Sequence, residues 1–387
     1  MAGGLRIPSP RISKPNLQLR GGPQLGSLLG KRGGKEGVVV GLELEAGSVG
    51  ATELAVNGEA RVTAAAVQPL PPGAFADGEV TDPEAVTTAL RALFTANKLS
   101  RRVRLGIANQ RVVVRTLRLP AIEDPAELDS AVRFSAQEQI AMPLDQAVID
   151  HRVVGGLPAS DGAPAQIDVI VVAARRDMIT ASLRPLKDAG LEPVGIDLSA
   201  FGMIRALAGA AGPAEADPDA APVASAVLYC SVGDVTNLAV AKGRSCLFTR
   251  VSPVGLDDVV SGLTGTSGLT PEHAQMWLNH VGLAKPVEQI EGDPAVIAQA
   301  RAALENGAAS LLDELRLSID FYGAQETAVP IERVVLCGTG SAIPGLAEEM
   351  QPDLGLPISV DSPAPLGGYG AESAARLTLP YGLALND

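Results

Sequence analysis

Short apolar runs separated by turn residues begin at residue 37, and this pattern is typical of β-strands joined by tight turns. The stretch GVVVGLELEAGSVGATELAVNG, residues 37–58, predicts a strand, a tight turn at 45–47 and a second strand. Its closing pair, Asn57-Gly58, is a strong hairpin signal because both residues tolerate the positive φ of a type I′ turn. Residues 37–67 are therefore predicted to form three short strands.

Helical spacing first appears after Asp82, which is predicted to cap a helix that has Pro83 in its first turn. The strands RVRLGIA and RVVVRTLRLP follow. The next elements are a helix from about Pro125 to Gln139, a strand, a loop at 156–166, a strand, and a helix from about Arg176 to Ala189 that stops at Gly190. This pattern predicts a small α/β subdomain inserted at 115–190.

The pattern restarts after 209–222, an Ala/Pro/Asp stretch that is predicted to be a loop between two halves. Residues 226–251 again predict three strands, with turns at Gly233-Asp234 and Lys242-Gly243. Within them TNLAVAKGRSCL parallels TELAVNGEARV of the first half, which is a weak internal repeat. Two halves that each open with a strand meander predict a duplicated α/β fold with a cleft between them.

The second half ends in a long helix and a loop of small residues. Apolar residues recur at helical spacing through 294–322. The strand RVVLCG then runs into Gly338-Thr339-Gly340, and a helix with Pro344 near its start is predicted next. Such a loop is one against which a flat ligand can pack.

Composition changes this picture mainly at the N-terminus. The chain has 387 residues, 46% of them hydrophobic and 3% aromatic, so cores of Ala, Val, Leu and Ile are expected. The net charge of −13 argues against nucleic-acid binding as the main role. Residues 1–36, however, hold seven Lys and Arg against one acid and are predicted to be a disordered basic tail. No apolar run is long enough to predict a membrane span, and no secretory signal is visible.

Cysteine and histidine give no sign of a metal centre. Cys230, Cys246 and Cys337 are widely spaced in apolar runs, which is typical of buried reduced thiols. The histidines have no Cys or acidic partner at metal-ligand spacing. We therefore predict no metal site, and no residue stands out as catalytic.

Three turns that contain glycine carry the candidate chemistry: Glu45–Gly47, Gly233–Asp234 and Gly338–Gly340. Each alone is weak, but their order is the plan of the actin/hexokinase/Hsp70 nucleotide fold. Over about residues 37–385 the chain resembles the PilM family of type IV pilus assembly, which is FtsA-related and actin-like. The resemblance rests on VRTLRLPAIEDPAELDSAVRFSAQEQIAMPLDQAVIDHRVVG, SPVGLDDV, LLDELRLSIDFY, IERVVLCGTGSAIPGLAEEM and LPYGLAL.

The resemblance implies a fold and a division of the chain. The fold is α/β, a duplicated actin-like fold with an inserted FtsA/PilM-type α/β subdomain. The expected parts are the tail at 1–36, the first half of actin-like domain 1 at 37–114, the inserted subdomain at 115–190, the return to domain 1 and linker at 191–222, and actin-like domain 2 at 223–387.

The resemblance also implies two binding functions. One is a cytoplasmic scaffold at the inner face of the cell membrane, which binds the N-terminal segment of PilN in a groove near the inserted subdomain. The other is ATP with Mg²⁺ in the central cleft. The cofactor-binding residues that the resemblance gives for this cleft are Gly47, Ser48, Gly233, Gly338, Thr339 and Gly340.

The phosphate side of that cleft departs from the family pattern Gly-Ile-Asp-Ile-Gly-Ser-Ser-Ser-Val-Lys. Here Glu43 replaces the aspartate, Glu45 the turn glycine and Gly50 the lysine, and in the second hairpin Cys230-Ser231-Val232 replaces Asp-Ile-Gly. A carboxylate about 4 Å from a phosphate oxygen costs about 4 kcal/mol at an effective dielectric of about 20. ATP hydrolysis is therefore not expected.

Two functions stay open. The first is a scaffold that links PilN and other pilus assembly proteins to the motor side, and the alternative is an ATP-binding conformational switch of the same complex. A sugar or acetate kinase on the same fold is a more distant reading, because no catalytic Asp or Glu with a matching substrate motif stands out. The oligomeric state is open as well.

Overall fold

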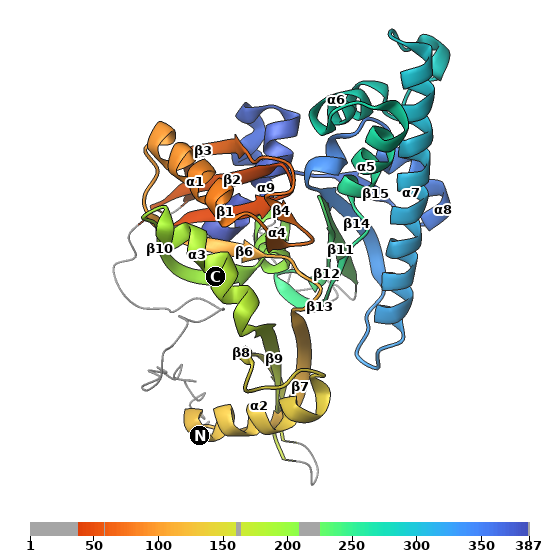
Figure 1. Cartoon of the computed structure of the whole chain (residues 1–387). Helices are drawn as coiled ribbons and strands as arrows, with labels where there is room; N and C mark the ends of the chain where they lie inside the picture. Colours follow the sequence, from red (N-terminus) through yellow and green to blue (C-terminus); the bar gives the residue numbers. More distant parts are fainter. Residues whose placement is uncertain (1–37, 58, 160–163, 209–224, 386–387) are drawn as a thin grey trace, which may run out of the picture.

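The computed structural model describes residues 38–57, 59–159, 164–208 and 225–385. The predicted tail, Gly58 of the predicted hairpin and the predicted linker 209–222 lie outside these residues. The described chain forms two halves, each built on a five-stranded sheet, and a smaller three-stranded sheet that projects from the first half (Figure 1).

The sheet of the first half has the order β10-β6-β1-β2-β3. Its strands are β1 (Val40–Glu45), β2 (Ser48–Asn57), β3 (Glu59–Pro69), β6 (Arg102–Ile107) and β10 (Glu192–Leu198), with the short pair β4 (Phe75–Ala76) and β5 (Glu79–Val80) beside them. The strands β1, β2 and β3 form the predicted meander, and Gly47 makes its first turn with φ +79°. Because β6 and β10 run parallel to β1, their carboxyl ends share an edge with that turn.

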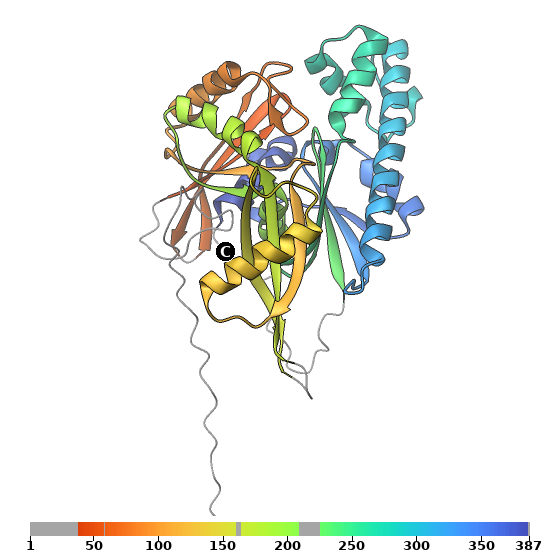
Figure 2. The ribbon, with the colours of Figure 1, turned by 60° about the horizontal axis from the view of Figure 1, so that its bottom comes forward.

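Helices cover both faces of this sheet. The helices α1 (Pro83–Asn97) and α3 (Arg176–Asp188) lie on one face, and α4 (Ser199–Ala208) and α9 (Ala371–Ala384) lie on the other (Figures 1 and 2). As predicted, the Asp82 carboxylate caps α1 by accepting two backbone N–H groups. Helix α9 returns from the end of the chain and packs directly on β1, where a Cβ at Gly41 would lie 1.9 Å from the Pro380 carbonyl oxygen.

The inserted unit has its own sheet and core. Its strands β7 (Val113–Pro120), β8 (Ala147–Leu157) and β9 (Gln166–Arg175) pair in the order β7-β9-β8, and α2 (Pro125–Gln139) packs on one face. Helix α3 lies within the predicted 115–190 span, yet Ile179 and Leu186 are buried in the core of the first half. We therefore propose that the inserted unit ends with β9. The other predicted boundaries remain predictions.

The second half repeats the sheet with different helices. Its strands are β11 (Ala226–Val232), β12 (Thr236–Lys242), β13 (Ser245–Ser252), β14 (Ile331–Cys337) and β15 (Ile358–Val360), in the order β13-β12-β11-β14-β15. One face of this sheet packs on four helices: α5 (Leu256–Ser267), α6 (Pro271–Val281), α7 (Pro294–Gly323) and α8 (Leu346–Leu354). Three short 3-10 helices are also present: η1 (Val287–Gln289), η2 (Thr339–Ala342) and η3 (Ala364–Tyr369). The other face meets α4 through Tyr229, Ala239 and Ala241. Helix α4 therefore lies between the two sheets.

The end of the second half follows the predicted order of strand, small-residue loop and helix. After β14 the chain makes η2, and α8 begins at Leu346, two residues after Pro344. Gly345 adopts φ +86°, and the Pro344 carbonyl accepts the Leu283 N–H at 2.6 Å. Those two features divert the backbone before a helix can start.

Candidate functional site

The three predicted turns meet in the cleft between the halves. The Ala46 N–H of the β1–β2 turn donates to Asp234 Oδ2, in the β11–β12 turn, at 3.3 Å. The Thr339 hydroxyl, in the loop after β14, donates to Glu45 Oε2 at 3.1 Å. The fold thus brings together residues 188 and 294 positions apart in the sequence.

Glu43 lies deepest in the cleft and is buried. Its Oε1 accepts the Ser199 hydroxyl at 2.6 Å, whereas Oε2 has no hydrogen-bond partner. A Cβ at Gly106 would lie 1.9 Å from Oε2, so the neighbouring strand β6 needs glycine here. Burial raises the pKa of Glu43 well above its usual range, and the Ser199 hydrogen bond opposes this. Burial therefore disfavours the charged form of Glu43, whose side chain packs against β6 and α4.

Glu45 sits at the rim of the same cleft, with a cation beside it. Burial raises its pKa, while Arg376 on α9 and the Thr339 hydroxyl lower it. The Arg376 guanidinium donates to the Ser48 hydroxyl at 2.9 Å, pairs with Glu372 on the same helix at 3.5 Å, and is largely buried. The sequence pattern pointed to a missing lysine at Gly50, and the structure supplies a positive charge from α9 instead.

Asp234 faces Glu45 from the second half. Its carboxylate accepts the Val235 N–H at 2.9 Å as well as the Ala46 N–H. Burial and the nearby Glu45 charge raise its pKa to about 7, against the two backbone hydrogen bonds. Asp234 therefore changes charge near neutral pH, which is far from ordinary for an aspartate.

Little space remains among these groups. The cavity that they line together with Asn237 has a volume of about 20 Å³, which is room for about one water molecule. Asn237 is 3% exposed, and neither its amide nitrogen nor its oxygen has a hydrogen-bond partner. Across the part of the chain that the structure describes, no three His, Cys, Asp or Glu side chains are arranged to hold a metal ion.

The predicted cofactor residues lie around this cleft in different roles. Ser48 accepts a hydrogen bond from Arg376, and Thr339 donates one to Glu45. Gly233 lies against Glu45, since a Cβ added at Gly233 would be 3.3 Å from Glu45 Oε1. Gly338 and Gly340 pack on β11, where added Cβ atoms would lie 2.6 Å from Ser231 Oγ and 2.5 Å from Val232 Cγ1, and Gly47 has open space around it. The pattern of glycines located the loops, Asp234 among them, but it missed three polar groups around the cleft: Ser199, Asn237 and Arg376.

Mg²⁺-ATP does not fit the cleft in this arrangement. Its phosphates would meet the carboxyl groups of Glu43, Glu45 and Asp234. The available 20 Å³ is far below the roughly 300 Å³ or more that a small-molecule site offers. The nearby cation, Arg376, already serves Ser48 and Glu45.

A larger groove of about 350 Å³ lies beside the inserted unit. Three parts of the chain form it: β8 and β9 of the insert, α4 of the first half, and the start of β13 in the second half. Its lining is apolar with arginines among it: Arg152, Val154, Ile170, Phe201, Ile204, Arg205, Arg244, Ser245 and Cys246. The Arg205 guanidinium pairs with buried Asp197 and donates to the Gly382 carbonyl, so it is held in place.

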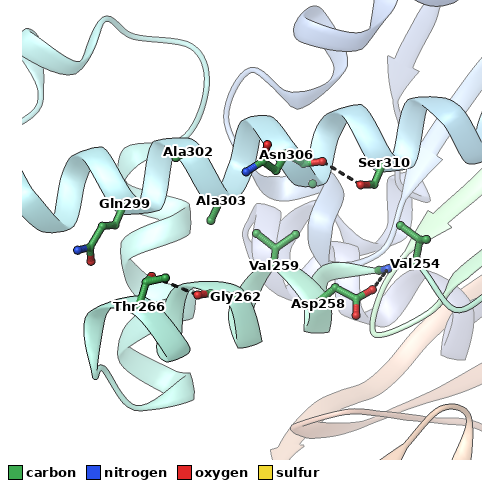
Figure 3. A pocket seen from close by; sticks show the side chains of 12 residues that line it. Val254, Asp258, Val259, Gly262, Thr266, Gln299, Ala302, Ala303, Asn306 and Ser310 are labelled. Atoms are coloured by element: carbon green, nitrogen blue, oxygen red, sulfur yellow. Dashed lines mark hydrogen bonds between the residues drawn. The ribbon is translucent and has the colours of Figure 1, made fainter.

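A third hollow, of about 520 Å³, lies between α5 and α7 (Figure 3). Figure 3 shows Val259, Ala303 and Asn306 near its middle, with Gln299 and Thr266 toward one end and Ser310 and Val254 toward the other. None of the predicted cofactor residues lines this hollow. Its small side chains account for the space, since Gly262 has nothing within 4 Å of its Cβ position.

Duplicated sheets around a cleft, with hairpins and a glycine loop facing each other, define a duplicated actin-like α/β fold. The family model for the type IV pilus assembly protein PilM matches residues 41–366, and the chain belongs to that family. The predicted fold class and family are thereby confirmed.

One solved structure shares the fold, and two others are similar at lower scores. A structure described as "PilM-PilN type IV pilus biogenesis complex" is 24% identical, with a TM-score of 0.73, over 89% of this chain and 97% of that chain. The ethanolamine utilization protein EutJ from Carboxydothermus hydrogenoformans is 16% identical, with a TM-score of 0.49, over 91% and 90%. MreB5 of Spiroplasma citri bound to ADP is 14% identical, with a TM-score of 0.47, over 89% and 94%. In the described residues, we find no helix that is both long and apolar enough to cross a membrane.

Proposed function

We propose that this chain is a scaffold of the type IV pilus assembly machine that docks the N-terminal segment of PilN in the groove beside the insert. The protein would act in the cytoplasm, at the inner face of the membrane that holds PilN, and it would link PilN to the motor side of the machine. Family membership and the PilM-PilN complex among the similar structures support this proposal.

The observation that carries it is the composition of the groove. Ile170, Phe201 and Ile204 give an apolar floor, and Arg152 and Arg244 are exposed at its margin. A register shift between Val153 and Gly155 makes Val154 the bulged residue of β8, and such bulges re-aim side chains. This surface suits an extended peptide with apolar side chains and at least one carboxylate.

A matched pair of variants tests the docking. Val154 lines the groove and is 43% exposed, whereas its neighbour Val153 is 45% exposed and does not line it. Val154→Asp removes an apolar contact and places an anion beside the arginines that would bind the peptide carboxylate, so the affinity for the PilN N-terminal peptide should fall at least about tenfold, which is about 1.4 kcal/mol. Val153→Asp should bind as the parent does.

Fluorescence anisotropy with a labelled synthetic peptide and the full chain provides the measurement. Thermal unfolding of both variants checks that they are folded. Equal affinities for the two variants, or no binding to the parent chain at low salt, would overturn the docking proposal.

The alternative is a nucleotide switch, which the retained loop Gly338–Gly340 favours. The present cleft would have to open and separate its carboxylates before a nucleotide entered. Calorimetry of the full chain with ATP and Mg²⁺ decides between the two functions. Micromolar, Mg²⁺-dependent binding supports the switch, and no heat at millimolar ATP rejects it.

A further inference from the structure

Two adjacent residues of the first half reach across the cleft and bind two separate loops of the second half. Glu45 accepts the Thr339 hydroxyl with Oε2, and its Oε1 lies against Gly233. The next residue, Ala46, donates its backbone N–H to Asp234. The turn between β1 and β2 therefore connects with both facing loops at once.

The charge of Glu45 has its counterpart in the same chain. Arg376 lies on α9, which packs on β1 and β2, and its guanidinium is fixed by Ser48 at 2.9 Å. Arg376 also pairs with Glu372 on its own helix at 3.5 Å, and it acts on Glu45 through its charge. The groups around Glu45 are thus Thr339, Asp234 and Arg376, with Glu43 behind it. A buried carboxylate with a nearby cation and a hydrogen-bond donor is far less costly than an isolated one.

We propose that Glu45, Arg376 and Thr339 form an internal latch that closes the cleft in place of a bound nucleotide. Glu45 supplies the anion, and Arg376 supplies the compensating cation from the first half. Thr339 supplies the hydrogen-bond donor on the second half. The closed arrangement of the halves is then a property of the chain itself. This inference goes beyond the docking function and does not depend on it.

Hydrogen exchange of the full chain, read by mass spectrometry, tests the latch. Thr339→Val removes the hydroxyl with almost no change in shape. Exchange at 43–47, 233–235 and 338–342 should accelerate about tenfold, as expected for losing a hydrogen bond to a charged group. The matched control is Thr63→Val, which removes a hydroxyl bond to Glu53 Oε1 of 2.9 Å within the first half and should leave those segments unchanged.

A second variant has a readout that simple loss of packing would not give. Arg376→Gln removes the cation that lowers the pKa of Glu45, so the charged form of Glu45 becomes more costly relative to its protonated form. Exchange in the same three segments should accelerate more at pH 8 than at pH 6, relative to the parent chain. An equal effect at both pH values would contradict the role assigned to Arg376.

Exchange of the parent chain is also measured in the presence of about 1 mM Mg²⁺-ATP, a concentration that would substantially occupy even a weak nucleotide site. Unchanged exchange in the three segments is the expected result. Protection of these segments by Mg²⁺-ATP, or no effect of Thr339→Val, would overturn the latch. Peptide docking is read by anisotropy at another site, so either proposal can fail without the other.

Discussion

Asp234 should make the stability of the protein depend on pH in the neutral range. Its pKa is raised to about 7 in the folded protein and is about 4 in an unfolded chain. Between these values the folded state holds a proton that the unfolded state has lost. The free energy of unfolding should therefore fall as pH rises from about 4 to about 7, and the loss is complete above pH 7.

The size of the effect follows from the same shift. One pKa unit corresponds to about 1.4 kcal/mol, so the interval from pH 5 to pH 7 would give at most about 3 kcal/mol. Asp234 keeps partial contact with solvent, which screens the repulsion from Glu45. We therefore expect about 1 to 2 kcal/mol over that interval.

Asp234→Asn removes the titrating group and keeps an oxygen that can accept the Ala46 N–H. Urea denaturation of the parent and the variant at several pH values from 5 to 8 gives the comparison. The advantage of the parent over the variant should shrink by about 1 to 2 kcal/mol as pH rises from 5 to 7. Parallel stability curves over this range would refute the assignment of Asp234 as the titrating group.

Asp177 supplies a control of opposite sign. The Arg175 guanidinium beside it lowers the pKa of Asp177 to about 2. Its contribution to stability is present above about pH 4 and is lost as pH falls toward 2. Asp177→Asn should thus leave the slope between pH 5 and pH 8 unchanged.

Two further predictions concern the packing that holds the site. Gly382→Ala should lower the free energy of unfolding by about 1 to 3 kcal/mol, because the new Cβ would lie 1.8 Å from the Gly202 carbonyl oxygen. The control is Gly367→Ala, whose new Cβ would meet nothing within 4 Å and should leave stability almost unchanged. Thermal unfolding of both variants gives the comparison. Arg205→Met leaves the Asp197 carboxylate buried without its cation and should cost about 3 to 5 kcal/mol in urea denaturation; a cost below about 1 kcal/mol would mean that the pair is not buried in solution.

Local sequence signals located most of the fold. The helix predicted at 125–139 is α2 with those bounds, and Asp124 caps it through two backbone N–H groups. The strands predicted over 37–67 are β1, β2 and β3, which pair antiparallel, with Gly47 in the turn between the first two. Signals of this kind succeed because they depend on neighbours a few residues apart.

The site could be predicted only in outline, because its key partners come from distant elements. Helix α9 was not predicted as a helix: Pro380 and Gly382 are poor helix formers, and the helix forms by burying Leu377, Leu379 and Leu383 against the first half. Arg376 therefore had no predicted position near Ser48, which is 328 residues away. The raised pKa of Asp234 likewise depends on a carboxylate from the other half of the chain.

The departures of this chain from the family pattern fit one another physically. Helix α9 closes over Gly50, where a Cβ would already lie 3.1 Å from Pro380 Cγ, so the lysine of the family pattern has no room there. The same helix brings Arg376 to Ser48, which restores a cation from another direction. Glu45 then occupies the cleft as an anion that this cation can compensate, and it engages Thr339 across the cleft. Glu43 Oε2 and the Asn237 amide stay without hydrogen-bond partners in this cleft, whereas Glu45 has both a nearby cation and a donor. At Glu45 the changes therefore favour closure of the cleft by side chains over simple decay of a phosphate site.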